Sequence, residues 1–454
     1  MTHVNVDFSK KLGPIKPLNG VGQPPLAGVD TGHFHYLTEA NVPYSRLHDV
    51  GGWFGQNMWV DIPNIFRDFD ADVNDPASYD FAFTDILIKG LVDAGCEPYY
   101  RLGVTIENFH QIKPYRIFPP KDYQKWAEIC EHIIRHYNEG WANGFHYNIQ
   151  YWEIWNEPDG APNKNEYEPL AGINENAMWK GTKEEFFDLY RVASKHLRKC
   201  FGNSIKIGGY GSCGFYIANS HQTVDGKAFG NAGADLSNWD YRIRWFYIFF
   251  MDFIEMVKKE NLPFDFFSHH SYAGPKDNLK HEALCEKCLA DMGLGDVEIH
   301  LNEWNTDNRR EDRGTTRACG NTVAMMCAMQ HTKMQIMCYY DARMAQSVFG
   351  GLFNPMTCTP VATYYGIMAF GRLRTLGTEV KMEIDNEDVF ALAATDGKKK
   401  GVLMANIGEE TEIATDLEEG MTVYRIDHEH FFTPTSLSAK SFTLKPFEVV
   451  YIEA

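Results

Sequence analysis

Apolar and polar positions follow a repeating pattern along most of this chain. From residue 42 onward, short apolar runs alternate with longer amphipathic segments, which is typical of repeated strand–helix units. The predicted strands are residues 44–48, 97–102, 149–155, 205–209, 264–269, 297–302 and 335–340. The predicted helices between them include residues 81–94, 123–137, 183–199, 242–260 and 314–333. We therefore expect an α/β fold, a (β/α)8 TIM barrel, whose third strand lies between Gly103 and Pro120.

The pattern changes after the helical run at residues 364–370. Residues 389–395 and 401–406 flank Asp396-Gly397, a strong hairpin signal, and further short strands follow without helices. At the other end of the chain, residues 4–8 alternate like a strand. The sequence therefore predicts an additional antiparallel β-sandwich domain built from both ends of the chain. The predicted boundaries are 1–20 for the N-terminal strand, 21–372 for the catalytic barrel and 373–454 for the C-terminal sandwich.

Composition and charge narrow the class of ligand. The chain has 454 residues, of which 44% are hydrophobic, so it can bury a large core. The formal net charge of −18 argues against a nucleic-acid partner or an anionic membrane, because either would require a basic face. The N-terminal residues lack the features of a secretory signal, and no stretch is long enough to span a membrane. We expect a cytoplasmic protein with reduced cysteines and a neutral ligand, and the sandwich could supply the interface of a homo-oligomer.

A strand in the middle of the chain stops at a carboxylate. Residues 151–157 read Tyr-Trp-Glu-Ile-Trp-Asn-Glu, and Pro158 follows, which can neither extend a helix nor donate to a strand ladder. In a parallel α/β barrel, chemistry takes place at the C-terminal ends of the strands, where side chains leave the core and meet a pocket shaped by loops. Glu157 is therefore either a catalytic residue or a polar residue that merely caps the next loop.

A second strand ends in the same way. Residues 297–305 alternate and reach Glu303, which is again followed by an aromatic residue. Three strand–helix steps separate the two glutamates, which places them on strands four and seven of the barrel. Across a barrel mouth, this arrangement brings two carboxyl groups over one bound molecule. Glycoside hydrolysis requires such a pair, about 5–5.5 Å apart when the reaction retains configuration.

These strands resemble those of a known family. Residues 151–158 and 301–305 look like the acid/base and nucleophile strands of clan A glycoside hydrolases, and most closely those of glycoside hydrolase family 39, the family of β-xylosidases and α-L-iduronidase. The segment Arg46-Leu47-His48-Asp49 is similar to the family's first-strand Arg-x-His motif, residues 207–209 to its fifth strand and residues 265–272 to its sixth. The resemblance implies a barrel with a β-sandwich and retaining hydrolysis without a cofactor.

The same resemblance implies roles for residues around the pair. Glu157 would be the general acid/base, with a raised pKa, and Glu303 the nucleophile, which must stay ionised. Asn156 would bond the 2-hydroxyl of the sugar. Tyr272, just past the sixth strand, would donate to the Glu303 carboxylate, or alternatively would only fill the barrel rim.

Other polar residues are candidates for binding substrate. His48 and Asp49 at the end of an early strand could bind sugar hydroxyls, although a satisfied core histidine is an equal alternative. His270 is a further candidate, and its neighbour His269 suggests a metal. Adjacent strand residues face opposite sides of a sheet, however, so at most one of the two points inward and no metal site is expected. The segment Cys285-Glu286-Lys287-Cys288 has metal-like spacing without a second pair, and it is predicted to be plain helix.

The eighth strand departs from the family pattern. Related enzymes usually offer a tryptophan platform beneath the sugar, whereas residues 337–341 supply tyrosines here, with Tyr340 as the candidate for substrate contact. Trp304 and Trp53 are alternative stacking residues, although a buried tryptophan usually belongs to the core.

Three classes of function follow from these patterns. The leading one is a retaining, exo-acting, β-xylosidase-like glycosidase that releases terminal sugars from oligosaccharides or glycosides. The sequence does not separate it from an α-L-arabinofuranosidase or another retaining glycosidase of the clan. The other two are a non-catalytic carbohydrate-binding barrel and a metal-dependent barrel hydrolase.

Overall fold

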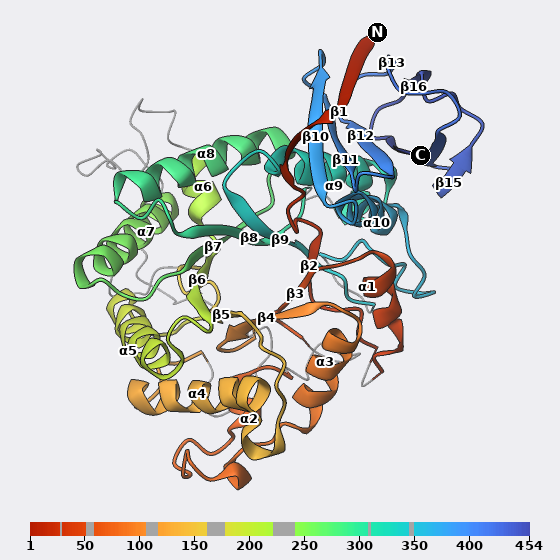
Figure 1. Ribbon diagram of the computed structural model, residues 1–454. Helices are drawn as coiled ribbons and strands as arrows, with labels where there is room; N and C mark the ends of the chain where they lie inside the picture. Colours follow the sequence, from red (N-terminus) through yellow and green to blue (C-terminus); the bar gives the residue numbers. More distant parts are fainter. Residues whose placement is uncertain are drawn as a thin grey trace.

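The computed structural model consists of a closed barrel of parallel strands, surrounded by helices, with a second sheet packed on one side (Figure 1). It describes residues 1–27, 30–50, 59–105, 117–160, 178–220, 241–306, 310–344 and 349–454. Both ends of the chain lie in the second sheet, so the barrel is formed by the middle of the sequence. The prediction of a TIM barrel with an additional β-domain is confirmed.

Eight parallel strands close the barrel in chain order. They are β2 (Gly20–Gly22), β3 (Tyr44–Leu47), β4 (Glu97–Leu102), β5 (Tyr151–Ile154), β6 (Lys206–Ser212), β7 (Phe266–Ser271), β8 (Glu298–Trp304) and β9 (Met334–Tyr340). Val21 pairs with Ser45 on one side and with Tyr339 on the other, which joins the first strand to the last.

The position predicted for the missing strand was wrong. The strand that completes the barrel is β2, which is the first in chain order and precedes the strand at residues 44–48. Among the described residues, no strand of the closed barrel lies between residues 103 and 120, of which 106–116 fall outside the description. With three residues, Gly-Val-Gly, β2 is too short to show alternation. A Cβ on Gly20 would lie 2.5 Å from the carbonyl oxygen of Met337, so the neighbouring strand requires glycine there. Arg46 therefore lies on the second barrel strand, not the first, while Glu157 and Glu303 keep strands four and seven.

The predicted helices are all present, and they pack around the barrel. The α-helices are α1 (His35–Glu39), α2 (Ile62–Ile65), α3 (Ala82–Asp93), α4 (Tyr123–Glu139), α5 (Lys183–Phe201), α6 (Phe215–Ser220), α7 (Tyr241–Glu260), α8 (Pro275–Asp291), α9 (Thr316–Met329) and α10 (Ala362–Arg374). Short 3-10 turns are η1 (Gly32–Phe34), η2 (Pro76–Ser78), η3 (Trp141–Asn143) and η4 (Arg310–Asp312).

Helix ends follow ordinary capping chemistry. Asp122 accepts a hydrogen bond from the backbone N–H of Lys125 at the start of α4, and Thr182 and Glu185 form a reciprocal capping box at the start of α5. The left-handed Gly140 ends α4. These signals fix the boundaries of the two helices that flank β5.

The second sheet has nine strands and is antiparallel apart from one pairing. Its strands are β1 (Thr2–Pro14), β10 (Thr378–Ile384), β11 (Val389–Thr395), β12 (Lys400–Asn406), β13 (Thr411–Thr415), β14 (Thr422–Ile426), β15 (Phe431–Thr435), β16 (Ser441–Leu444) and β17 (Val449–Glu453). The predicted hairpin of β11 and β12 is confirmed, and the N-terminal strand β1 joins this sheet antiparallel to β10 and parallel to β13. Its inner faces enclose an apolar core of their own.

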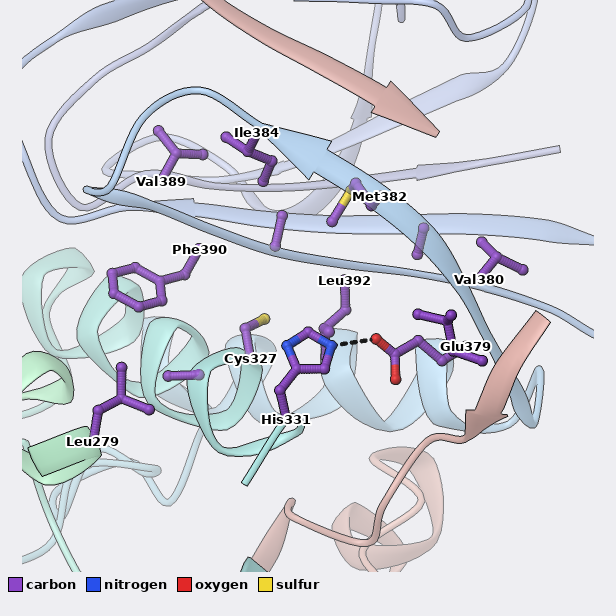
Figure 2. Close-up of a pocket in the computed structure, with 14 residues that line it drawn as sticks. Leu279, Cys327, His331, Glu379, Val380, Met382, Ile384, Val389, Phe390 and Leu392 are labelled. Carbon is purple, nitrogen blue, oxygen red and sulfur yellow. Dashed lines mark hydrogen bonds and ion pairs between the residues drawn. The ribbon is translucent and has the colours of Figure 1, made fainter. Parts of the chain in front are cut away.

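Helix α9 packs against β11 and β12, which fastens the sheet to the barrel. A cavity of about 420 Å³ lies at this junction, lined mainly by apolar side chains such as Leu279, Met382 and Phe390. Figure 2 shows the ion pair between His331 and Glu379 at one end of it. The cavity lies beside the barrel and contains neither of the two predicted catalytic glutamates.

All ten cysteines are free thiols, and Cys285 and Cys288 are buried within α8, as the helical interpretation of that segment predicted. Among the described residues, no helix combines the length and the apolarity needed to cross a lipid bilayer. Cytoplasmic location and a homo-oligomer stay predictions.

A buried carboxyl group on α8 makes the stability of the fold sensitive to pH. Glu282 is 1% exposed, neither of its side-chain oxygens has a hydrogen-bond partner among the described residues, and burial raises its pKa to about 8. The folded protein therefore binds a proton that the unfolded chain releases at a lower pH. The free energy of unfolding should fall on the order of 4 kcal/mol between pH 4.5 and pH 8 from this group alone.

The variant Glu282→Gln removes that titration, so its stability should decline less over the same range in urea unfolding. The exposed Glu255→Gln on α7 is the matched control and should behave like the parent protein. Parallel pH profiles for the parent and Glu282→Gln would contradict this account.

Candidate active site

Glu157 stands on a sharp turn immediately after β5. The backbone N–H of Trp155 still donates to the carbonyl of Leu102 on β4 (2.8 Å), but Trp155 and Glu157 have left-handed φ angles of 72° and 48°. Such angles are uncommon outside glycine, and here hydrogen bonds hold them: the N–H of Glu157 donates to the carbonyl of Gly211 on β6 (3.0 Å). The turn directs the carboxylate to the mouth of the barrel.

Glu303 faces Glu157 from β8. One carboxylate oxygen from each glutamate and a ring nitrogen of His270 all lie within 4.8 Å of one another. The Glu303 side chain is 8% exposed and that of Glu157 is 21% exposed, so both can be reached from solvent. Two strands distant in sequence thus present a pair of carboxyl groups at one end of the barrel.

A buried guanidinium lies beneath this pair. Arg46, on β3, is 1% exposed and donates through Nη1 to Glu303 Oε2 (3.1 Å) and through Nε to Glu153 Oε2 (2.9 Å). Its Nη2 also donates to the side-chain oxygen of Asn156. Burial alone would lower the pKa of Arg46, but Glu153 and Glu303 outweigh it and hold that pKa above its usual range. Arg46 therefore carries a permanent positive charge beside Glu303.

Glu153 anchors Arg46 from the barrel interior. Its side chain is fully buried, and its second oxygen, Oε1, accepts hydrogen bonds from Ser268 Oγ and Asn302 Nδ2, each at 2.6 Å. Both side-chain oxygens of Glu153 therefore accept hydrogen bonds from these donors. Arg46 is thus held in one orientation by the carboxylates of Glu153 and Glu303.

Tyr272 and His270 complete the surroundings of the two carboxyl groups. The hydroxyl of Tyr272 donates to Glu303 Oε1 (2.7 Å), as predicted. His270 Nδ1 is hydrogen-bonded to Glu157 Oε1 (2.7 Å) and lies 3.8 Å from Glu303 Oε2. Its neighbour His269 packs its ring against Phe215 and Phe267, so only one of the two histidines contacts the pair.

The two glutamates differ in their electrostatic environment. Burial first, and then the charges of Asp49 and Glu153, raise the pKa of Glu157 to about 7 against the opposing charge of Arg46. The pKa of Glu303 is also raised, first by burial, but His270, Arg46 and the Tyr272 hydroxyl all act to lower it. Glu157 can therefore hold a proton near neutral pH, while direct donors favour the ionised form of Glu303.

The remaining sequence-predicted polar residues form one wall of the site. The Asn156 amide donates to Nε2 of His48 (3.2 Å), and this nitrogen lies 3.2 Å from Asp49 Oδ1. The Tyr340 hydroxyl donates to Asp49 Oδ2 (2.9 Å). Burial holds the pKa of His48 well below its usual range, so its imidazole is neutral. The structure thus brings Asn156, His48, Asp49 and Tyr340 together, with hydrogen bonds from Asn156 to His48 and from Tyr340 to Asp49.

Trp304 has a different environment from the one predicted. It is fully buried and packs edge-on against Tyr339, with ring centroids 5.4 Å apart. Strand alternation explains this, because Glu303 faces the site and its neighbour must face the opposite side. The placement argues against Trp304 as a stacking surface for sugar, and Trp53 lies outside the described residues.

Sequence reasoning missed the parts that Glu153, Ser268 and Asn302 play in this site. The one signal that the sequence offered for them was a charged or polar residue inside an apolar strand.

Glu157, His270 and Glu303 are also a set of ligand atoms that could surround a cation. Arg46 already supplies a positive charge to Glu303 at 3.1 Å. The guanidinium therefore offsets the charge of the Glu303 carboxylate, and the absence of a metal stays a prediction.

A parallel barrel with two facing carboxyl groups at the ends of strands four and seven is the arrangement that glycoside hydrolysis uses. The comparisons with known proteins agree with this assignment. The model of "Glycosyl hydrolases family 39" matches residues 38–298, more than half of the chain, a range that contains Glu157 and ends before Glu303. The chain belongs to glycosyl hydrolases family 39.

Individual relatives are more distant. The chain is 27% identical over 179 residues to a β-xylosidase of Caldicellulosiruptor saccharolyticus, a match that covers 38% of this chain and 31% of that protein. The chain spans less than half the length of the curated relatives it matches. Among solved structures, it resembles a glucosidase from Croceicoccus marinus (TM-score 0.75, 18% identity, 100% and 98% of the two chains) and a GH39 β-xylosidase from Caulobacter crescentus (TM-score 0.67, 17% identity, 99% of each).

The hydrogen bond from Tyr272 to Glu303 has a measurable consequence. In Tyr272→Phe, the Glu303 carboxylate loses a donor, so its pKa should rise and the acidic limb of the kcat/KM–pH profile should move to higher pH. A hydrogen bond to a charged group contributes about 1.5–3 kcal/mol, which corresponds to a loss of roughly 10- to 150-fold in kcat/KM on an aryl glycoside.

Tyr190→Phe is the matched control, because it also removes a buried hydroxyl, one that donates to the carbonyl of Pro263 (2.9 Å). It should leave the acidic limb in place. An unshifted limb in Tyr272→Phe would show that this hydroxyl does not tune Glu303.

Proposed function

We propose that this protein is a retaining, exo-acting, β-xylosidase-like glycoside hydrolase that acts by double displacement. The observation that carries the proposal is the pair Glu157 and Glu303, whose nearest ligand atoms lie within 4.8 Å across the barrel mouth. An inverting enzyme needs room for a water between its carboxyl groups and separates them by roughly 6.5–9.5 Å. The short separation supports a direct attack on the sugar.

Each glutamate has one task in the first half of the reaction. Glu157, with a pKa of about 7, donates its proton to the glycosidic oxygen as the bond to the leaving group breaks. The ionised Glu303 attacks the anomeric carbon and forms a glycosyl ester. Arg46 and Tyr272 hold the Glu303 carboxylate toward the substrate before it reacts.

The second half reverses the role of Glu157. Once the leaving group has taken its proton, the Glu157 carboxylate accepts a proton from an incoming water, and the resulting hydroxide attacks the anomeric carbon and releases Glu303. His270 lies 2.7 Å from Glu157 Oε1 and keeps that carboxyl in place in both protonation states. We propose that Asn156, held by Arg46, bonds the sugar 2-hydroxyl and that His48, Asp49 and Tyr340 bind other hydroxyls.

The sugar is proposed from the comparisons together with the site. Two curated relatives are β-xylosidases, and similar structures include a β-xylosidase, a glucosidase and an arabinofuranosidase. We place β-xylosides first, with α-L-arabinofuranosides as the alternative. A panel of nitrophenyl glycosides that covers both sugars and both anomers decides between them, and digestion of oligosaccharides shows whether single terminal sugars are released.

The leaving group tests the role of Glu157. In Glu157→Gln, hydrolysis of an alkyl glycoside should fall about 10²–10⁴-fold, the usual contribution of general acid catalysis. An activated nitrophenyl glycoside should lose much less in the first step, because its leaving group needs little protonation. The parent enzyme should lose kcat/KM as pH rises above about 7, where Glu157 loses its proton, and Glu157→Gln should lack that alkaline limb.

Glu303→Ala should abolish hydrolysis of both kinds of substrate, and it should keep the parent circular dichroism spectrum but melt at a lower temperature, because Arg46 loses a partner. Full activity in either variant would overturn the assignment. Calorimetric binding of sugar to the parent protein without any product would instead support a carbohydrate-binding barrel.

A further inference from the structure

The residue two places after Glu157 is another buried carboxylate. Asp159 is fully buried, and it faces the end of β6, the strand next to β5 in the barrel (Figure 1). Burial raises the pKa of Asp159 to about 6, although hydrogen bonds to its carboxylate oppose the rise, so the group is mostly ionised near pH 7. A buried charge is costly unless it is paired or hydrogen-bonded. The proposed reaction assigns Asp159 no task.

Three donors at the end of β6 satisfy this carboxylate. Asp159 Oδ2 accepts from Ser212 Oγ (2.5 Å) and from the backbone N–H of Gly214 (3.4 Å). Asp159 Oδ1 accepts from the backbone N–H of Cys213 (3.1 Å). Ser212 Oγ in turn accepts from the N–H of Phe215, the first residue of α6 (3.2 Å). The side chain of Asp159 therefore binds the backbone that leads from β6 into α6.

Further hydrogen bonds fasten the same turn through its main chain. The N–H of Glu157 donates to the carbonyl of Gly211 (3.0 Å), and the indole N–H of Trp245 on α7 donates to the carbonyl of Asp159 (3.1 Å). Gly211 is itself held from β7, because its N–H donates to Ser268 Oγ (2.9 Å). The turn that carries Glu157 is thus tied to β6 and to α7.

Glu157 depends on this turn for its position. Glu303 receives direct donors from two side chains, Arg46 and Tyr272. Among the described residues, by contrast, the ring of His270 is the one hydrogen-bond partner of the Glu157 side chain. The left-handed φ of 48° at Glu157 is a conformation that persists only where the surrounding structure enforces it. Loss of the bonds that hold the turn should therefore move the carboxyl group.

We propose that Asp159 is a positioning residue for the proposed general acid/base, because its carboxylate clamps the turn that carries Glu157 to the end of β6. Asp159 acts through Glu157 and does not contact the substrate in this role. A displacement of about 1 Å in a reacting group can cost on the order of 100-fold in rate. The inference rests on the proposed glycosidase function and deepens it by naming the interaction that keeps the proton donor in place.

Two kinds of glycoside separate a positioning role from a general loss of stability. In Asp159→Ala the clamp is lost, so kcat/KM on an alkyl glycoside, whose leaving group needs the proton of Glu157, should fall roughly 100-fold. The loss on an activated nitrophenyl glycoside should be much smaller, because its leaving group needs little protonation. Asp159→Asn keeps an oxygen for the N–H of Cys213 and gains an amide that can donate to Ser212, so it should recover most of the lost activity.

A double variant shows whether the effect passes through Glu157. In Glu157→Gln general acid catalysis is already absent, so the addition of Asp159→Ala should cause little further loss of kcat/KM on a phenyl glycoside. Two independent effects would multiply instead. Ser212→Ala removes one donor to Asp159, and it should show a smaller loss with the same bias against alkyl glycosides. This variant provides the test if Asp159→Ala does not fold.

Asp265→Ala is the matched control. Asp265 Oδ2 also accepts from the backbone of β6, through the N–H of Ile207 (2.7 Å), but it does so at the opposite end of the strand. This variant should lower the melting temperature, because a backbone donor loses its partner, and it should leave the ratio of activities on the two glycosides at the parent value.

Hydrogen exchange in the full chain tests the clamp without any activity. The backbone amides of the peptides that contain Glu157 and Ser212 should exchange faster in Asp159→Ala than in the parent, and near the parent rate in Asp159→Asn. The proposal is overturned by unchanged exchange in Asp159→Ala, by an equal loss of kcat/KM on both glycosides, or by a full further loss in the Glu157→Gln background. A parent protein that hydrolyses no glycoside would contradict the proposed function, and the exchange rates would then still decide whether Asp159 clamps the turn.

Discussion

The buried guanidinium of Arg46 is the interaction on which the barrel mouth depends. It joins the Glu153 carboxylate within the barrel to the Glu303 carboxylate at its rim, and it also fixes the side chain of Asn156. Charges are costly to bury unless they are paired, and removing one partner of a buried pair destabilises a protein by about 3–5 kcal/mol. Neither Arg46 nor Glu153 can therefore be replaced alone. The same pairing that stabilises the interior places a positive charge against Glu303 and so separates its chemistry from that of Glu157.

The barrel turns this local interaction into a site with two unlike carboxyl groups. Closure of the parallel strands brings the ends of β5 and β8 to one rim, and the left-handed turn at Glu157 lifts its carboxylate away from the strand. Glu303 receives direct donors from Arg46 and Tyr272, whereas the neighbours of Glu157 include the negative charges of Asp49 and Glu153. Position in the barrel sets the distance between the groups, and their partners set which one holds a proton.

Sequence patterns were sufficient for the strands that end in Glu157 and Glu303, because alternation over several residues and a following turn signal are local properties. They failed for β2, whose three residues carry no periodicity and whose identity depends on the close approach of β9. Glu153 stood out as a charge inside an apolar strand, but its role was out of reach, since its partners Ser268 and Asn302 lie 115 and 149 residues away and meet it only when the barrel closes. For Trp304, alternation itself held the answer: a residue next to the inward-facing Glu303 must face the packed side of the strand.

The most direct test of the account is to trap the proposed intermediate with a 2-deoxy-2-fluoro xyloside that carries an activated leaving group, and to map the labelled peptide by mass spectrometry. A double-displacement enzyme should be inactivated in a time-dependent manner and should carry one glycosyl group on the peptide that contains Glu303, while Glu303→Ala remains unlabelled. Turnover of the parent substrate without any covalent adduct, together with product of inverted anomeric configuration, would contradict the assignment of Glu303 as the nucleophile.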